Sequence, residues 1–239
     1  MVREVRATPR VPGGSRRYVG RIATYVLIPG AGDTAWSWSF VASALRERGH
    51  EAIAVDLPLA DDAAGLQQYA DAVIEAIGRR DDLVVVAHSL GGFTAPLVCA
   101  RVPARLLVLA AAMVPAPGET GNEWWTSSGY LEATRDAPSY DDEIELFLHD
   151  APPERAAEML ERGPGQSETP MREPWPLDRW PDVPTRYLLF RDDRFFPAEF
   201  ARRLARERLG VVADEMDGAH CAYLSRPDEL AARLDAYLA

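Results

Sequence analysis

The run Leu83–Ala87 limits the fold more than any other feature, because all of its residues, LVVVA, are apolar. A strand that is apolar on both faces needs cover on both faces, which is typical of a parallel sheet between two layers of helices. Gly91 and Gly92 follow closely, and apolar spacing predicts a helix over residues 91–101. The sequence therefore predicts an α/β fold that is built around this strand.

Short apolar runs and amphipathic segments alternate along most of the chain, which implies a mostly parallel sheet with helices on both faces. The predicted strands are residues 22–28, 52–57, 83–87, 106–110, 185–190 and 211–215. The predicted helices are residues 35–48, 66–78, 91–101, 197–207 and 227–238. Between residues 114 and 184 the alternation stops, and only weak helices are predicted, near residues 142–148 and 153–162.

The predicted organisation is one core domain, residues 22–113 and 185–239, with a small cap or lid inserted at residues 114–184. Such an insertion follows a strand at the carboxyl edge of the sheet, where open α/β folds place their sites. Residues 1–21 contain six arginines and a single glutamate, together with prolines and glycines. They are expected to form a flexible basic tail, with a targeting arm as the alternative.

Composition excludes several kinds of chemistry. All 26 basic residues are arginine, so the chain has no Schiff-base lysine and no lysine-bearing phosphate loop. The net charge of −11 argues against nucleic acid and against anionic membrane surfaces as partners. The two cysteines and four histidines lack metal-ligand spacing, so no metal, cofactor or disulfide is expected. We expect a reducing, cytoplasmic location.

The segment from Ala87 to Gly92, AHSLGG, lies between a predicted buried strand and a predicted helix. It is close to the G-x-S-x-G nucleophile elbow, with Ala87 at the first glycine position. Such a tight turn projects the serine hydroxyl above the sheet, at the positive end of the helix dipole. Ser89 is therefore the candidate nucleophile, and the alternative is a serine that only caps the following helix.

A candidate base and a candidate acid follow in the order Ser, Asp, His that hydrolases use. His220 lies in a loop after the last predicted strand, at the same edge of the sheet as Ser89. Asp192 and Asp193 both follow the strand predicted at residues 185–190, and either could orient the imidazole. Periodicity does not choose between these two aspartates. Surface positions for all three residues are the alternative.

Two backbone amides are expected to form an oxyanion hole. One belongs to Leu90, directly after the serine, and the other to Ala31, in the glycine-bearing loop after the first strand. An ordinary strand-to-helix turn is the alternative for that loop.

Several residues of the insertion are candidates for the wall of a substrate pocket: Trp124, Trp125 and His149. Equally, the tryptophans of the insertion could form a small core of its own. Of the remaining histidines, we expect His88 to be structural and His50 to be exposed.

Taken together, these motifs resemble the α/β-hydrolase superfamily, and more narrowly the small esterases and methylesterases related to plant hydroxynitrile lyases. The resemblance covers residues 22–239 and is carried by VLIPGAG at 26–32, WSW at 36–38, DLP at 56–58, AHSLGG at 87–92, DDRFFP at 192–197 and GAH at 218–220. It implies an α/β-hydrolase fold with Asp193, four residues before Pro197, as the triad acid. It also implies Ala31 and Leu90 as the oxyanion donors.

Two positions depart from the pattern of these relatives. Pro29 stands where many of them have a histidine. Cys221 stands where the cyanide-releasing lyases carry a lysine, so lyase activity is not expected.

The resemblance and the ordered motifs predict a serine hydrolase that cleaves carboxylic esters of small, largely apolar substrates through an acyl-enzyme. The same triad could instead open lactones, cleave carbon–carbon bonds or perform a biosynthetic cyclisation, because fold does not determine reaction. A hydrolase-like protein that binds ligands without catalysis is the third alternative. The expected partner is a small ester-like molecule, with no nucleic acid and no membrane; the sequence leaves the oligomeric state open.

Overall fold

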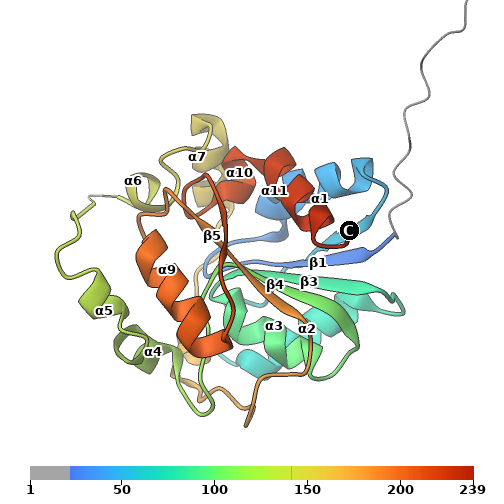
Figure 1. The fold of residues 1–239 in the computed structure, drawn as a ribbon, viewed down its shortest axis with the longest axis horizontal. Helices are drawn as coiled ribbons and strands as arrows, with labels where there is room; N and C mark the ends of the chain where they lie inside the picture. Colours follow the sequence, from blue (N-terminus) through green and yellow to red (C-terminus); the bar gives the residue numbers. More distant parts are fainter. Residues whose placement is uncertain (1–21, 141) are drawn as a thin grey trace, which may run out of the picture.

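The computed structural model describes residues 22–140 and 142–239, so the expected basic tail at 1–21 lies outside the described residues. Within them, the strands form one parallel sheet in the order β2-β1-β3-β4-β5-β6 (Figure 1). The strands are β1 Thr24–Ile28, β2 Glu51–Ala54, β3 Leu83–Ser89, β4 Ala104–Ala112, β5 Thr185–Phe190 and β6 Asp214–Met216. The predicted α/β fold with a mostly parallel sheet is confirmed.

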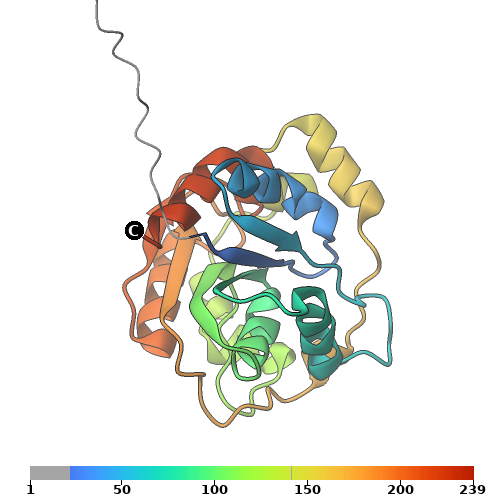
Figure 2. The same cartoon turned by 90° about the vertical axis from the view of Figure 1, so that its right-hand side faces the viewer.

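Helices cover both faces of the sheet, as Figures 1 and 2 show. One face carries α2 Leu66–Ile77, α3 Gly91–Cys99 and α9 Ala198–Leu204, and the other carries α1 Ala35–Glu47, α10 Ala222–Ser225 and α11 Pro227–Ala236. The central strand β3 sends alternate side chains to the two layers. Val85 belongs to the first core and Val84 to the second, and both are fully buried. This two-sided burial is the reason for the unbroken apolar run, and it contributes roughly 2 kcal/mol per valine.

Helix α3 lies unusually close to the sheet, and two glycines make this approach possible. A Cβ atom at Gly92 would come within 1.9 Å of the Met113 carbonyl oxygen. A Cβ atom at Gly91 would come within 2.6 Å of the Pro29 carbonyl oxygen. Because both obstacles are backbone atoms, a side chain at either position would push the helix away from the strands.

The long segment between β4 and β5 contains α4 Gly121–Ser127, α5 Tyr130–Ala133, α6 Glu143–Phe147, α7 Pro153–Arg162 and α8 Thr169–Arg172. Helices α6 and α7 lie where the sequence predicts weak helices, whereas α4, α5 and α8 were not predicted. Helix α4 begins with a capping box, in which Thr120 and Glu123 bond each other's backbone amides. That pattern is visible in the sequence and would have identified α4.

Tryptophans of this segment do not form a separate core. Trp124 and Trp175 are fully buried in the core that the sheet shares with α2 and α3. Their indole Nε1 atoms donate to the carbonyl oxygens of Val114 and Phe93, each at 3.0 Å. Trp180 donates likewise to Pro115 at 3.1 Å. The Trp175 indole therefore bonds the segment to α3, while the indoles of Trp124 and Trp180 bond the start of the segment itself.

The expectation for His50 is wrong. Its side chain is buried between the start of β1 and α11, where Nε2 lies 2.9 Å from Asp235 Oδ1. Its Nδ1 accepts a hydrogen bond from the Ala23 amide at 3.3 Å. Sequence periodicity missed this burial because it depends on a helix 185 residues further along the chain.

Candidate active site

Ser89 is the last residue of β3 and directly precedes the turn into α3. Its φ is +50°, in the left-handed region that residues with a side chain rarely adopt. The surrounding structure maintains this strained conformation, because the Ser89 carbonyl accepts from the Met113 amide at 2.9 Å and α3 packs tightly on the sheet. The strand, the strained serine and the helix together have the geometry of a nucleophile elbow.

His220 and Asp193 form a buried, bonded pair at the same edge of the sheet. The ring nitrogen Nδ1 of His220 lies 2.8 Å from Asp193 Oδ2, and both residues are at most 5% exposed. The other carboxylate oxygen of Asp193 accepts from the amides of Phe195 and Phe196 at 2.8 and 2.9 Å. Because a carboxylate with two amide donors can only accept, Nδ1 of His220 carries the proton and Nε2 is free to act as a base.

Asp192, the other candidate acid, has a different position. Its Oδ2 accepts from the Gly218 amide at 3.1 Å, and its own amide donates to the Gly218 carbonyl at 3.1 Å. These bonds join the loop after β5 to the loop after β6, which carries His220. Asp193, and not Asp192, is therefore the aspartate that contacts the imidazole.

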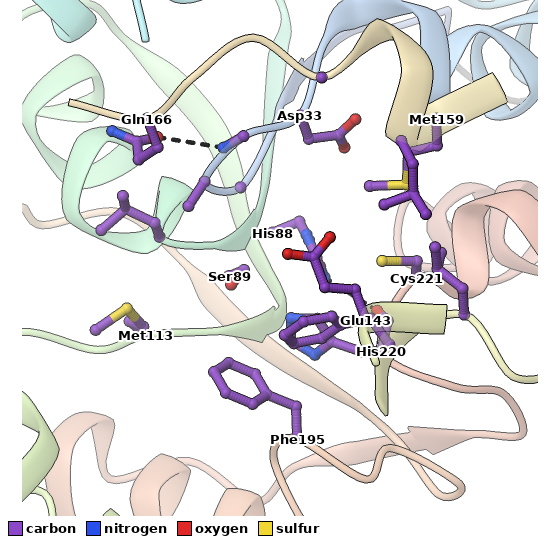
Figure 3. Close-up of a pocket in the computed structure, with 18 of the residues that line it drawn as sticks. Asp33, His88, Ser89, Met113, Glu143, Met159, Gln166, Phe195, His220 and Cys221 are labelled. Atoms are coloured by element: carbon purple, nitrogen blue, oxygen red, sulfur yellow. Dashed lines mark hydrogen bonds between the residues drawn. The ribbon is translucent and has the colours of Figure 1, made fainter. Parts of the chain in front are cut away.

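Ser89 and His220 line one cavity of about 520 Å³ (Figure 3). The wall is largely apolar, and much of it comes from the segment between β4 and β5. Residues of that segment on the wall include Met113, Trp125, Glu143, Phe147, Leu148, Met159, Leu160, Pro164, Gln166 and Met171. Phe195, from the loop that carries Asp193, closes another side. The cavity can enclose a small apolar molecule next to the serine hydroxyl.

Two backbone amides at the cavity have no acceptor among the described residues: those of Ala31 and Leu90. Leu90 directly follows the serine, and Ala31 belongs to the loop after β1. Both residues line the cavity beside Ser89. Unpaired amides beside a serine hydroxyl can donate to an anionic oxygen that develops there.

Asp33, at the end of the same loop, is a buried carboxyl group at the cavity. Burial raises its pKa to about 6, although three donors oppose that increase. Those donors are the Ser37 hydroxyl, the Thr34 amide at 2.7 Å and the Tyr223 hydroxyl at 2.9 Å. With its oxygens bonded, Asp33 anchors the loop to α1 and α10.

His88 contacts His220, the candidate base. Its Nε2 lies 3.0 Å from the His220 carbonyl oxygen, and the two rings are 4.5 Å apart. Burial and the neighbouring His220 ring lower the pKa of His88 well below its usual value. The neutral ring therefore donates from Nε2, in agreement with the expected structural role.

The structure places the three residues expected at the pocket wall in different surroundings. Trp125 lines the cavity, whereas Trp124 lies fully buried in the core, with its indole bonded to the backbone. His149 is not part of the wall either. Adjacent residues on α4 point in different directions, so a run of tryptophans cannot all face the cavity. Sequence reasoning missed Gln166, Met113 and Met171, because their proximity depends on long-range packing.

Among the described residues, no group of three His, Cys, Asp or Glu side chains could hold a metal ion. None of the helices in this part of the chain combines the length and the apolarity needed to cross a bilayer.

Comparison with known proteins adds three observations. The model of the alpha/beta hydrolase family matches residues 25–233. A probable esterase of Oryza sativa, PIR7A, is 35% identical over 107 residues, which are 40% of this chain and 41% of that protein. The chain thus spans about two fifths of the length of that relative. Norfluorocurarine synthase 1 of a Strychnos species is 22% identical and covers more, 86% of this chain and 91% of its own.

A solved structure is also similar. The crystal structure of polyneuridine aldehyde esterase superimposes with a TM-score of 0.75 at 19% identity, and the alignment covers 91% of this chain and 99% of the other. At this level of identity the likeness concerns the fold, which is that of an α/β-hydrolase.

Proposed function

Because this chain belongs to the alpha/beta hydrolase family, we propose that it is a serine hydrolase that cleaves carboxylic esters of small, largely apolar substrates. One observation carries the proposal. The strained Ser89 and the bonded His220–Asp193 pair line the same cavity, beside two unpaired amides. The esterase names of the rice relative and of the similar solved structure support the same reaction class.

In the proposed mechanism, Ser89 Oγ attacks the ester carbonyl carbon while His220 Nε2 accepts the hydroxyl proton. Asp193 holds the imidazole through Nδ1 and stabilises the imidazolium. The amides of Ala31 and Leu90 donate to the oxyanion. His220 then gives its proton to the leaving alkoxide, so an alcohol departs and an acyl-enzyme remains. Water, deprotonated by the same ring, releases the acid and restores Ser89.

Replacement of the nucleophile tests the reaction class. Ser89→Ala is expected to lower turnover of short 4-nitrophenyl esters on the order of 10³-fold or more, because the hydroxyl is the attacking group. Exposed Ser39 is the control, and Ser39→Ala should retain full activity. A fluorophosphonate should label wild type at Ser89. Ester turnover that survives Ser89→Ala would falsify the proposal, and absence of labelling would favour a protein that binds ligands without catalysis.

A second reaction on the same three residues is the alternative: lactone opening, carbon–carbon cleavage or a biosynthetic cyclisation. The observation in its favour is the match to norfluorocurarine synthase 1 over most of both chains. A substrate panel that includes lactones and β-diketones beside simple esters separates the two. If lactones or β-diketones are turned over faster than simple esters, and this turnover depends on Ser89 in the same way, that reaction would replace the esterase assignment.

Residues 114–184 act as a cap in this proposal, because much of the cavity wall comes from them. Cys221 is buried and Cys99 is partly buried, and burial raises the pKa of both thiols. Such unreactive free thiols suit a cytoplasmic location, which we include in the proposal.

A further inference from the structure

The loop after β1 that carries the Ala31 amide, residues 30–33, is bonded to a side chain of the proposed cap. Gln166 Oε1 accepts from the Gly32 amide at 3.2 Å, across 134 residues of sequence (Figure 3). Residues 31 and 32 form a turn, in which Gly32 has a φ of +67°, a value that glycine adopts readily. The amides of Gly32 and Ala31 are adjacent: Gln166 accepts from the Gly32 amide, and the Ala31 amide, at the cavity, has no acceptor within residues 22–140 and 142–239.

The orientation of the Gln166 amide is determined by its other partners. Nε2 donates to the Ser167 carbonyl at 2.7 Å and to the Tyr69 hydroxyl at 3.1 Å. A carbonyl can only accept, so the nitrogen must face Ser167, and the oxygen must face Gly32. The reversed amide would oppose its NH₂ group to the Gly32 N–H, leaving two donors in contact.

The segment that carries Gln166 is itself firmly attached. The Ser167 amide donates to the Leu59 carbonyl at 2.6 Å, and the Ser167 hydroxyl donates to Asp62 at 2.8 Å. On the other side, a Cβ atom at Gly163 would lie 2.8 Å from the Gly32 carbonyl oxygen, so the two backbones are in close contact. Gln166 thus lies between a fixed part of the core and residues 30–33.

We propose that Gln166 is a positioning residue that holds residues 30–33 so that the Ala31 amide points at the developing oxyanion. This inference rests on the proposed serine hydrolase function. A peptide plane rotates as a unit, so fixing the Gly32 amide also fixes the carbonyl of Ala31 and limits its ψ. Oxyanion donors act only when they are aimed in advance at the place where charge develops.

The test compares two glutamines that make the same kind of bond. Gln166→Met removes the acceptor while keeping the length of the side chain. Gln68→Met is the matched control, because Gln68 Oε1 accepts from the Gly65 amide at 3.0 Å and is not part of the cavity wall. Tyr69→Phe is the milder variant, since it removes only one partner of Gln166 Nε2.

For Gln166→Met we expect kcat for a short ester to fall about tenfold to a hundredfold while KM changes less than threefold. The affinity for a trifluoromethyl ketone, which forms an oxyanion on the serine, should fall by a similar factor. Tyr69→Phe should change both quantities in the same direction by a smaller factor, and Gln68→Met should change neither. A merely structural role would lower the melting temperature without separating kcat from KM.

Hydrogen exchange of the peptide covering residues 29–35 supplies a readout that needs no activity. Faster exchange in Gln166→Met, but not in Gln68→Met, is expected. Equal exchange in both variants, or equal kcat and equal ketone affinity, overturns the positioning role. If wild type neither cleaves esters nor reacts with a fluorophosphonate, the serine hydrolase function fails. Faster exchange would then assign Gln166 to loop structure alone, and its role in positioning the oxyanion donor would be overturned.

Discussion

At the scale of residues, Asp192 and Asp193 are neighbours in sequence but make different hydrogen bonds. Asp193 accepts from two amides and the imidazole, so its side chain is held in one orientation. Asp192, its neighbour in sequence, instead bonds the backbone of Gly218. The sequence leaves these two aspartates as alternatives, because side chains of adjacent residues point in different directions and spacing alone does not say which one faces the ring. A family motif favours Asp193, and the hydrogen bonds agree.

Asp193→Asn is expected to lower kcat for ester hydrolysis on the order of 10³- to 10⁴-fold, because the amide would favour the wrong tautomer of His220. Asp192→Asn keeps one acceptor oxygen for Gly218 and should retain activity within a fewfold. Steady-state kinetics of the two purified variants measure both effects. A reversed order of the two losses would assign the acid to Asp192.

Asp33 makes stability depend on pH. Its pKa is about 6 in the folded protein, where burial disfavours the charge, and 3.8 is its ordinary value. The folded state therefore binds more protons than the unfolded state between these values, and the free energy of unfolding falls as pH rises from about 4 to 6. Relative to Asp33→Asn, wild type should lose about 2 kcal/mol across that range.

Urea unfolding of wild type and Asp33→Asn at several pH values measures this difference directly. Asp136→Asn is a control at an exposed aspartate in another part of the chain. A difference between wild type and Asp33→Asn that stays constant from pH 4 to 6.5 would contradict the raised pKa.

At the scale of elements, the contact between α3 and the sheet determines where Ser89 projects. Gly92 on α3 faces the Met113 carbonyl so closely that only a hydrogen fits. We expect Gly92→Ala to destabilise the protein by about 3 kcal/mol or more, because the obstacle is backbone that cannot rotate away. Gly165→Ala is the control, since nothing lies within 4 Å of that position, and it should change stability by less than about 0.5 kcal/mol. Thermal unfolding with equal midpoints for the two variants would disprove this account of the contact.

The sequence predicts the core elements to within a few residues, because buried strands and amphipathic helices have distinct apolar periods. It fails for α5 and α8, which are four residues long and have no room for a period. The strand predicted at residues 211–215 is β6, Asp214–Met216. The helix predicted at residues 197–207 is α9, which ends at Leu204 and is followed by a π-helical turn, Ala205–Leu209.

Of the candidate site, Ser89, His220 and Asp193 are predictable from motifs. The contact between Gly32 and Gln166 is not, since no local pattern marks a bond between two loops so far apart.

At the scale of the whole molecule, charge is the property that bears on the substrate. The net charge is −11, and the cavity wall contains Asp33 and Glu143 but no arginine among the described residues. Anionic esters should therefore enter less readily than neutral or cationic ones, and the preference should weaken as salt screens the field.

A choline ester and its uncharged isostere, the 3,3-dimethylbutyl ester, measure this preference as a ratio of kcat/KM values. Glu143→Gln should lower that ratio by a few-fold, because the carboxylate at the wall attracts the ammonium group. Glu132→Gln changes the net charge equally but lies on α5, outside the wall, and should leave the ratio nearly unchanged. Equal ratios in the two variants would show that Glu143 has no part in selection.

The indole bonds of Trp124, Trp175 and Trp180 have a consequence for chimeric proteins. The Trp175 indole bonds Phe93 of α3, the other two indoles bond Val114 and Pro115 at the start of the segment, and the rings of Trp124 and Trp175 fill space in the interior shared with α2 and α3. A graft that exchanged residues 114–184 for the corresponding stretch of a related protein would leave holes beneath the sheet unless the donor brought equally placed large rings. New specificities would therefore be obtained more readily by altering the parts that face the substrate than by replacing the stretch as a block.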